Sequence, residues 1–507
     1  MSRTPVATTD YSTIFLERAE AWSEDQRAWP LYRQALIQLD LEHPPEWMRD
    51  EKIDAFYWDG SYAQTPNFQS DHWPDVAHWF ELRRDALDLL RRGSERPGLG
   101  FVIQRDPTTY TEEDRRAIPD LNRFAEDAFA KNAPPLVWTF DAVAVYQRLL
   151  RACIYLRIDA LRAAEIGDGA TSIASIRAML RIAAHCQEIP GSIGIIFAHR
   201  IERTAYSTIN EILSRGDEIW SETQLRDLAQ LVAAGEPDYR REFAGNRAFF
   251  QDVLQRLYSD DGHGDGRMTK QGLEWMQNYT DRINVDAAST KMKNWLEESL
   301  GIPYAYQTYS LPLINVRTAS RTEMTAYYDR QMELFLLQNE TPLWKKVAQQ
   351  PDDWDNAETR SKYWLAWLFL PMPPRGECQT FQGYRDGALI GLALERYRRN
   401  HGVCPARLNE LVPDYLSELP VDRINGTPLI YKLIDGAPIV YGTGVDGIDE
   451  NGKLDEWCYG LWTEHPTVMP PNSLAKKSGD WVVWSLLPEH QPPAVDARLK
   501  REAEEMD

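Results

Sequence analysis

Residues 387–453 read GALIGLALERYRRNHGVCPARLNELVPDYLSELPVDRINGTPLIYKLIDGAPIVYGTGVDGIDENGK. Apolar residues recur at steps of three and four as far as Tyr397, which predicts a helix that ends at Gly402. A short leucine-bearing helix and a proline-valine-aspartate corner follow. Three strands are predicted after them, at residues 429–434, 438–441 and 481–484. The long helix must cover one face of this small sheet, so residues 376–490 are predicted to form an α+β domain.

An ordered series of landmarks runs through this predicted domain. They are residues 393–397, Gly402, Pro405, Leu408, residues 411–412, residues 419–422, Gly426, Pro428, residues 430–431, Gly444 and residues 446–447. In this order they resemble the globular domain of the major pseudopilin of type II secretion systems. The chain departs from that family because its helix follows a long preceding chain instead of an apolar leader helix, so filament assembly is not implied. Residues 422–426 read DRING where the family has aspartate-proline-tryptophan-glycine.

The resemblance also implies a calcium site in the loop that follows the glycine-aspartate-glycine turn. Here that loop offers Asp446, Asp449, Glu450, Asn451, Asp455 and Glu456. Calcium takes roughly six to eight oxygen ligands, and acids on a glycine-softened loop can supply several of them. We take Asp446, Asp449, Asn451 and Asp455 as the candidate ligands. The alternative is a solvated hairpin tip, since tight turns select the same residue types.

A second acidic loop, at residues 260–269, partly matches an EF-hand. Asp261, His263 and Asp265 take its first, third and fifth positions, and Gly266 takes the sixth. The twelfth position is Gly272 instead of a bidentate acid. Asp261 and Asp265 are therefore a second candidate metal pair, against the alternative of an Asx-rich helix cap and turn.

The chain before this domain is predicted to be helical throughout. Helical periodicity marks residues 31–39 and 74–92 within an N-terminal segment, 1–135. Glycine and proline breaks divide residues 140–215 into three antiparallel helices of a second segment, 136–370. No fixed repeat period recurs, so the fold class is mainly α, an irregular helical bundle or solenoid followed by the α+β domain. Prolines 371, 373 and 374 mark the boundary, and residues 491–507 are predicted to form a charged tail.

The net charge and the hydropathy of the chain limit the kinds of partner that we expect for it. The net charge of −21, from 77 acidic and 56 basic residues, argues against nucleic acid as a partner. No apolar run approaches the ~20 residues of a spanning helix, and the N-terminus as given shows no signal peptide. The resemblance nevertheless favours the cell envelope. Cys153 and Cys186 lie in apolar helical sequence and are expected to be buried thiols.

Catalytic motifs are missing from the sequence. It contains no phosphate-binding loop, no HExxH and no nucleophile elbow. His199 and Glu202 form an HxxE pair one helical turn apart, but the acids and the second histidine of a di-metal bundle are lacking, so we expect a hydrogen-bonded or surface histidine. The sequence favours a non-enzymatic interaction or scaffold protein with protein partners. The alternative is a hydrolase with paired carboxylates in an aromatic-rich cleft, suggested by the 18 tryptophans.

Overall fold

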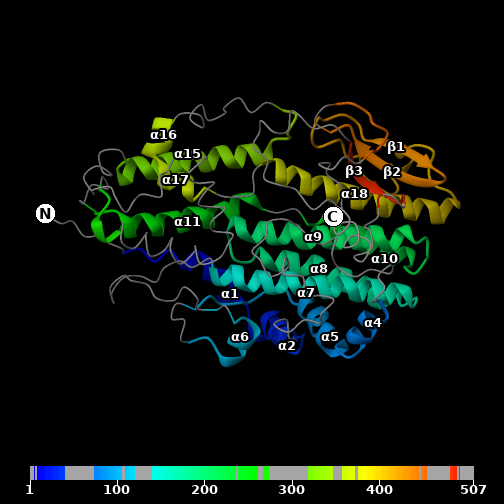
Figure 1. Cartoon of the computed structure of the whole chain (residues 1–507), viewed down its shortest axis with the longest axis horizontal. Coiled ribbons are helices and arrows are strands. Elements are labelled where there is room, and N and C mark those ends of the chain that lie inside the picture. The colour runs from blue at the N-terminus through cyan, green and yellow to red at the C-terminus, as the bar shows by residue number, and fades with distance from the viewer. Residues whose placement is uncertain are drawn as a thin grey trace, which may run out of the picture.

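Three consecutive helices form the centre of the molecule in the computed structural model (Figure 1). They are α7 (Phe140–Glu165), α8 (Gly169–Cys186) and α9 (Ser192–Ser214). The turn from α7 to α8 needs a left-handed residue, which Gly167 supplies with a φ of 76°. Asp168 then caps α8 by accepting a hydrogen bond from the Thr171 amide at 3.0 Å. The three helices predicted between residues 140 and 215 are confirmed.

The N-terminal helices after the first lie along one side of this central trio, whereas α1 contacts the later helix Tyr239–Leu257 (Figure 1). Their bounds are Thr13–Ala21 for α1, Glu24–Gln26 for the 3-10 helix η1, Trp29–Leu39 for α2, Trp73–Glu81 for α4, Arg84–Ser94 for α5 and Glu112–Ala117 for α6. The prediction of one helix over residues 74–92 is wrong, because the chain breaks at Arg83. The guanidinium of Arg83 lies 3.7 Å from the centroid of the Trp79 ring, which covers its charge.

The remaining helices lie on the α9 side of the trio (Figure 1). Their bounds are Glu222–Ala233 for α10, Tyr239–Leu257 for α11, Arg321–Glu340 for α15, Ala357–Lys362 for α16, Trp364–Leu368 for α17, Arg375–His401 for α18 and Leu408–Leu411 for the 3-10 helix η6. α11 and α15 pack together around a second hydrophobic core, in which the rings of Phe250 and Tyr328 stack with centroids 3.8 Å apart. α18 packs against both α9 and α10.

The sheet has three antiparallel strands in the order β1, β2, β3. Their bounds are Ile430–Ile434, Ala437–Gly442 and Trp481–Ser485, close to the predicted strands. Asp435 and Gly436 both adopt positive φ, 51° and 85°, between β1 and β2. This is the conformation of a two-residue hairpin turn, so the turn sets a register in which Ile434 pairs with Ala437.

A row of glycines joins α18 to the third strand. Gly383, Gly387 and Gly391 follow one another at four-residue steps and so share one face of α18. A Cβ at Gly383 or Gly391 would overlap the ring of Trp481 or Trp484, and one at Gly387 would overlap the main chain of Val483. The missing side chains let β3 lie directly on the helix. One hydrophobic core consequently runs from α2 through the central trio to α18 and β3.

The structure describes residues 5, 8–39, 73–104, 109–119, 121, 140–235, 238–260, 266–272, 318–345, 357–370, 375–444, 447–453, 480–487 and 490. Across these ranges the chain is mainly α-helical with one small antiparallel sheet, so the predicted fold class is confirmed at that level. No helix within them is long and apolar enough to cross a membrane. Cys153 and Cys186 are buried thiols, as predicted.

Candidate functional site

Two of the six predicted metal ligands, Asp449 and Asn451, can be placed in the structure. Both lie in the exposed turn that follows β2, and Asn451 adopts a left-handed backbone with a φ of 66°. The other four lie outside the described residues: Asp261, Asp265, Asp446 and Asp455. The structure therefore tests only part of the loop after β2, and the ligating positions of the loop at residues 260–269 stay a prediction.

Asp449 is an ionised carboxylate held against the hairpin. Its Oδ1 accepts hydrogen bonds from the Asn451 amide at 2.9 Å and from the Tyr441 hydroxyl at 2.8 Å. These bonds, and the nearby Lys432 amine, lower the pKa of Asp449. The Lys432 amine also lies 2.7 Å from Asn451 Oδ1 and 3.5 Å from Asp449 Oδ2. A lysine cation thus shares the oxygens that a metal would use.

A buried carboxyl, Asp480, lies beside this turn and was not predicted. Asp480 precedes β3, is fully buried, and accepts a hydrogen bond from the Gly452 amide at 2.6 Å through Oδ2. Burial, together with the nearby carboxylates of Glu450 and Asp449, raises the pKa of Asp480 to about 6. Asp480 Oδ1 and Glu450 Oε2 are both buried without a hydrogen-bond partner in the described structure. Two buried oxygens here lack a donor or a cation.

No group of three or more histidine, cysteine, aspartate or glutamate side chains is arranged to hold a metal ion within the described ranges. The turn after β2 comes nearest, with Asp449, Glu450 and Asp480 close enough to act on one another electrostatically. A metal there would need further oxygens from the main chain or from Asp446 and Asp455. The residues present therefore fit a calcium site only in part.

A second group of polar side chains is buried between α9 and α18. His199, Glu202 and Tyr206 occur at three- and four-residue steps on α9, and their exposed fractions are 2%, 8% and 2%. The imidazole of His199 stacks on the Phe381 ring of α18 with centroids 4.4 Å apart. From α18 the Arg385 charge acts on all three α9 side chains. Arg385 and Glu202 therefore lie in the contact between α9 and α18, where Arg203 and Asp386 are buried as well.

Arg385 and Glu202 are not ion-paired with each other in the described structure. Burial raises the pKa of Glu202 to about 8, although the Arg385 charge opposes the rise, so Glu202 is mostly protonated at neutral pH. Burial, reinforced by Arg385, lowers the pKa of His199 to about 3, so the imidazole is neutral. Arg385 is then the only charged member of this group.

His185 is a buried histidine of the same bundle, and both of its ring nitrogens have hydrogen-bond partners. Its Nδ1 lies 2.9 Å from the Tyr32 hydroxyl and its Nε2 lies 3.0 Å from the Arg96 carbonyl. Both ring nitrogens are used, and burial lowers the pKa of His185 to about 4. The expectation of a hydrogen-bonded or surface histidine was made for His199, and its surface alternative is wrong because His199 is 2% exposed. His199 differs from His185, because its Nδ1 is buried with no hydrogen-bond partner in the described structure.

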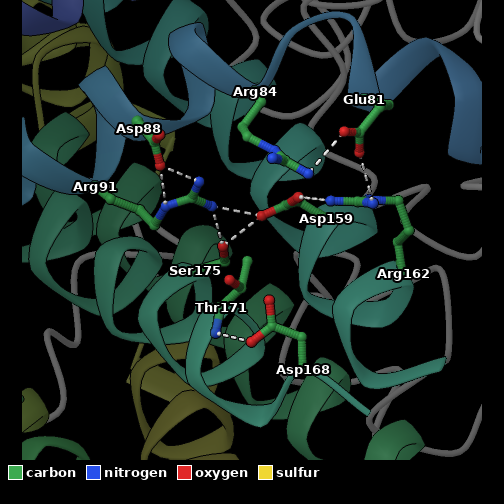
Figure 2. A network of polar contacts seen from close by, with 9 residues as sticks. All are labelled: Glu81, Arg84, Asp88, Arg91, Asp159, Arg162, Asp168, Thr171 and Ser175. Atoms are coloured by element: carbon green, nitrogen blue, oxygen red, sulfur yellow. Dashed lines mark hydrogen bonds and ion pairs between the residues drawn. The ribbon is translucent and has the colours of Figure 1, made fainter. Parts of the chain in front are cut away.

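A third polar network ties the N-terminal layer to the central trio (Figure 2). The buried carboxylate of Asp159 on α7 pairs with Arg91 of α5 and with Arg162, and it accepts a hydrogen bond from Ser175 of α8 at 2.7 Å. Arg162 reaches on to Glu81 of α4 at 3.3 Å. Each charge in the network has an opposite partner, so its evident role is to fix the position of α4 and α5 on the trio.

The surface beside this network is hollowed between α2 and α5. The pocket has a volume of about 450 Å³. It is lined by Gln34, Gln38, Asp85, Asp88, Leu89, Arg91 and Arg92. Asp88 is ion-paired with Arg91, and no aromatic ring is among these lining residues. This pocket therefore lacks the aromatic lining that the hydrolase alternative expects.

Tryptophans of the described structure mainly fill the core. The exposed fractions of Trp73, Trp364 and Trp367 are 6%, 6% and 8%, and Trp220, Trp481 and Trp484 are fully enclosed. Their number therefore does not by itself indicate an aromatic binding cleft. Comparison of the chain with family models, with curated proteins and with solved structures finds no match.

Proposed function

We propose that the chain is a non-enzymatic interaction or scaffold protein, an irregular helical bundle that carries a pseudopilin-like, calcium-binding module. The observation that carries this proposal is the double role of α18. Its glycine face receives β3 while other faces pack on α9 and α10. A module built in this way is held firmly to the helical body, with its hairpin turn at Asp435 and Gly436 exposed.

The order of elements supports the pseudopilin-like part. A long helix, a short 3-10 helix and a three-stranded antiparallel sheet follow one another in α18, η6 and β1–β3. Tyr397 near the end of α18 bonds to Glu410 of η6 at 2.8 Å, and Tyr431 of β1 bonds to the Pro405 carbonyl at 2.9 Å. Tyr397, Pro405 and Tyr431 are among the landmark residues on which the resemblance rests.

The buried acids support the calcium part. Glu450 Oε2 and Asp480 Oδ1 lack hydrogen-bond partners in the described structure, and a buried carboxylate oxygen without a partner is costly. A calcium ion would neutralise these carboxyls and fasten the turn after β2 to the start of β3. Asp449, Asp446 and Asp455 would supply further oxygens. The Lys432 amine would then leave Asp449 and Asn451.

Exposed apolar side chains support the interaction part. Leu82, between α4 and α5, and Ile166, after α7, are 70% and 66% exposed. An ion pair joins Glu81, which precedes Leu82, to Arg162, which lies one helical turn before Ile166; Figure 2 shows this ion pair. Each of these two exposed apolar side chains is available to a protein partner.

Site-specific cross-linking tests the interaction proposal. Photoreactive benzoylphenylalanine is placed at Ile166, and at exposed Gln230 on α10 as a matched control, and the chain is illuminated in its native cells. We expect one adduct of defined mass from position 166 and none from position 230. Equal labelling at both positions, or no adduct at either, would contradict a protein contact at position 166.

A further inference from the structure

Arg385 of α18 differs from Arg157 and Arg256, two buried arginines of the described structure. Arg157 pairs with Glu211 at 2.8 Å and Arg256 pairs with Asp252 at 3.2 Å, as buried guanidinium groups require. Arg385 is partly exposed, yet its Nε and Nη1 are buried and have no hydrogen-bond partner among the described residues. No described carboxylate pairs with it, and the nearby Asp386 is taken by Arg423 at 2.6 Å.

The α9 side chains that face Arg385 also have unused polar atoms. The Tyr206 hydroxyl and the His199 Nδ1 are buried without partners in the described structure. The Tyr239 hydroxyl of α11 is not part of this set, because Cys378 and Gln382 of α18 lie within its reach. The unpartnered polar atoms therefore come from α9 and α18, and buried polar atoms in native proteins almost always have partners. A bound group or ordered water must occupy this place.

The balance of charge decides between water and an anion. Glu202 of α9 is close enough to interact with Arg385, and at neutral pH it is mostly protonated. The Asp386 charge also reaches Tyr206, but Asp386 is ion-paired with Arg423. Water can satisfy the Tyr206 hydroxyl and the His199 nitrogen, but it does not neutralise Arg385, whose Nε and Nη1 are buried. A cation would be repelled by Arg385. An oxyanion satisfies both needs, because it accepts several hydrogen bonds and neutralises the arginine.

We propose that an oxyanion group, the carboxylate or phosphate of a small ligand, binds between α9 and α18 against Arg385, Tyr206 and His199. The protonated carboxyl of Glu202 donates to the same group. The ligand enters from the side on which Arg385 reaches solvent. Because α18 also holds the sheet, occupancy would tighten the contact between the helical body and the C-terminal domain. This site is independent of calcium and of the cross-linking surface.

Anion-dependent unfolding of the full chain tests the proposal. Unfolding temperature is measured in sodium phosphate, sodium acetate and sodium chloride of equal ionic strength at pH 7. We expect phosphate or acetate to raise it in a saturable way while chloride does not, and the effective salt identifies which oxyanion is bound. Identical curves in all three salts would overturn the proposal.

Two variants and one control assign the effect to this site. Arg385→Gln should weaken binding of the effective anion by about tenfold or more, since a charge-assisted contact is lost. Tyr206→Phe keeps the ring and should weaken binding by a few fold, which keeps the test decisive if Arg385→Gln does not fold. Arg423→Gln removes a neighbouring arginine that already has a partner and should leave the anion response intact. An undiminished response in both Arg385→Gln and Tyr206→Phe would refute the site.

Discussion

Replacing Gly391 by alanine tests the contact that joins α18 to the sheet. The added Cβ would come within 3.0 Å of the buried Trp484 ring, a separation that real Cβ atoms essentially never show. In an open helix the change would stabilise the protein by about 1 kcal/mol, because alanine is the better helix former. Overpacking costs about 1–3 kcal/mol, and the upper end applies because the rigid indole of Trp484 is fully enclosed. We expect a net destabilisation of about 2 kcal/mol.

The assay is urea unfolding followed by tryptophan fluorescence and circular dichroism, combined in a double-mutant cycle. Trp484→Phe shortens the ring that the new methyl meets, so the effect of Gly391→Ala should shrink by at least about half in that background. Gly387→Ala is the control, because its methyl meets the main chain of Val483, which Trp484→Phe leaves in place. A stabilising Gly391→Ala, or an effect unchanged by Trp484→Phe, would refute the close packing of β3 on this helix.

Three further expectations follow from the buried charges. Folding raises the pKa of Glu202 from its ordinary 4.5 to about 8. The buried carboxyl is therefore compatible with folding while it is protonated at low pH, and as the pH rises from 4.5 toward 8 the free energy of unfolding falls by about 1.4 kcal/mol per pH unit. The unfolding temperature of Glu202→Gln should therefore fall less than that of the unaltered chain between pH 5 and 8; parallel curves would disprove the buried acid. Asp159→Asn leaves Arg91 and Arg162 without their shared carboxylate and should lower the free energy of unfolding by about 3–5 kcal/mol. The control is Asp414→Asn at an exposed position, which should lower it by less than about 1 kcal/mol. Lys432→Met removes the amine that competes for Asp449 and Asn451, so calorimetry should show tighter calcium binding, and weaker binding would mean that the lysine does not compete.

Local patterns were sufficient to predict most elements of the described fold. The end of α2 at Leu39 and the three helices between residues 140 and 215 follow from apolar periodicity and its glycine and proline breaks, and the Asp435-Gly436 pair lies at the hairpin between β1 and β2. Both depend on residues a few positions apart, where spacing and turn chemistry act directly. The break between α4 and α5 was missed because the apolar stripe runs on through it. Arg83 occupies the position of the apolar stripe between Phe80 and Leu87. A charged residue at that position was the available signal for the break between α4 and α5.

Candidate sites were harder to predict because they depend on tertiary packing. Asp480 meets Gly452 only because β3 pairs with β2, and nothing in local spacing connects the two. Arg385 and Glu202 each interrupt the apolar stripe of their helix, which could have marked them. Their meeting, however, is set by how α18 packs on α9. The loop ligands Asp261, Asp265, Asp446 and Asp455 lie outside the described residues, so their role stays a prediction.

Calcium-dependent unfolding tests most directly the claim that the chain carries a pseudopilin-like, calcium-binding module. Unfolding temperature is measured with calcium and with chelator for the unaltered chain, for Asp480→Asn and for the exposed control Asp414→Asn. Calcium at a hundredfold its Kd stabilises a folded site by about 2.7 kcal/mol. The account predicts a clear rise with calcium in the unaltered chain and the control, and its loss in Asp480→Asn. The same unfolding temperature in calcium and in chelator for the unaltered chain would contradict it.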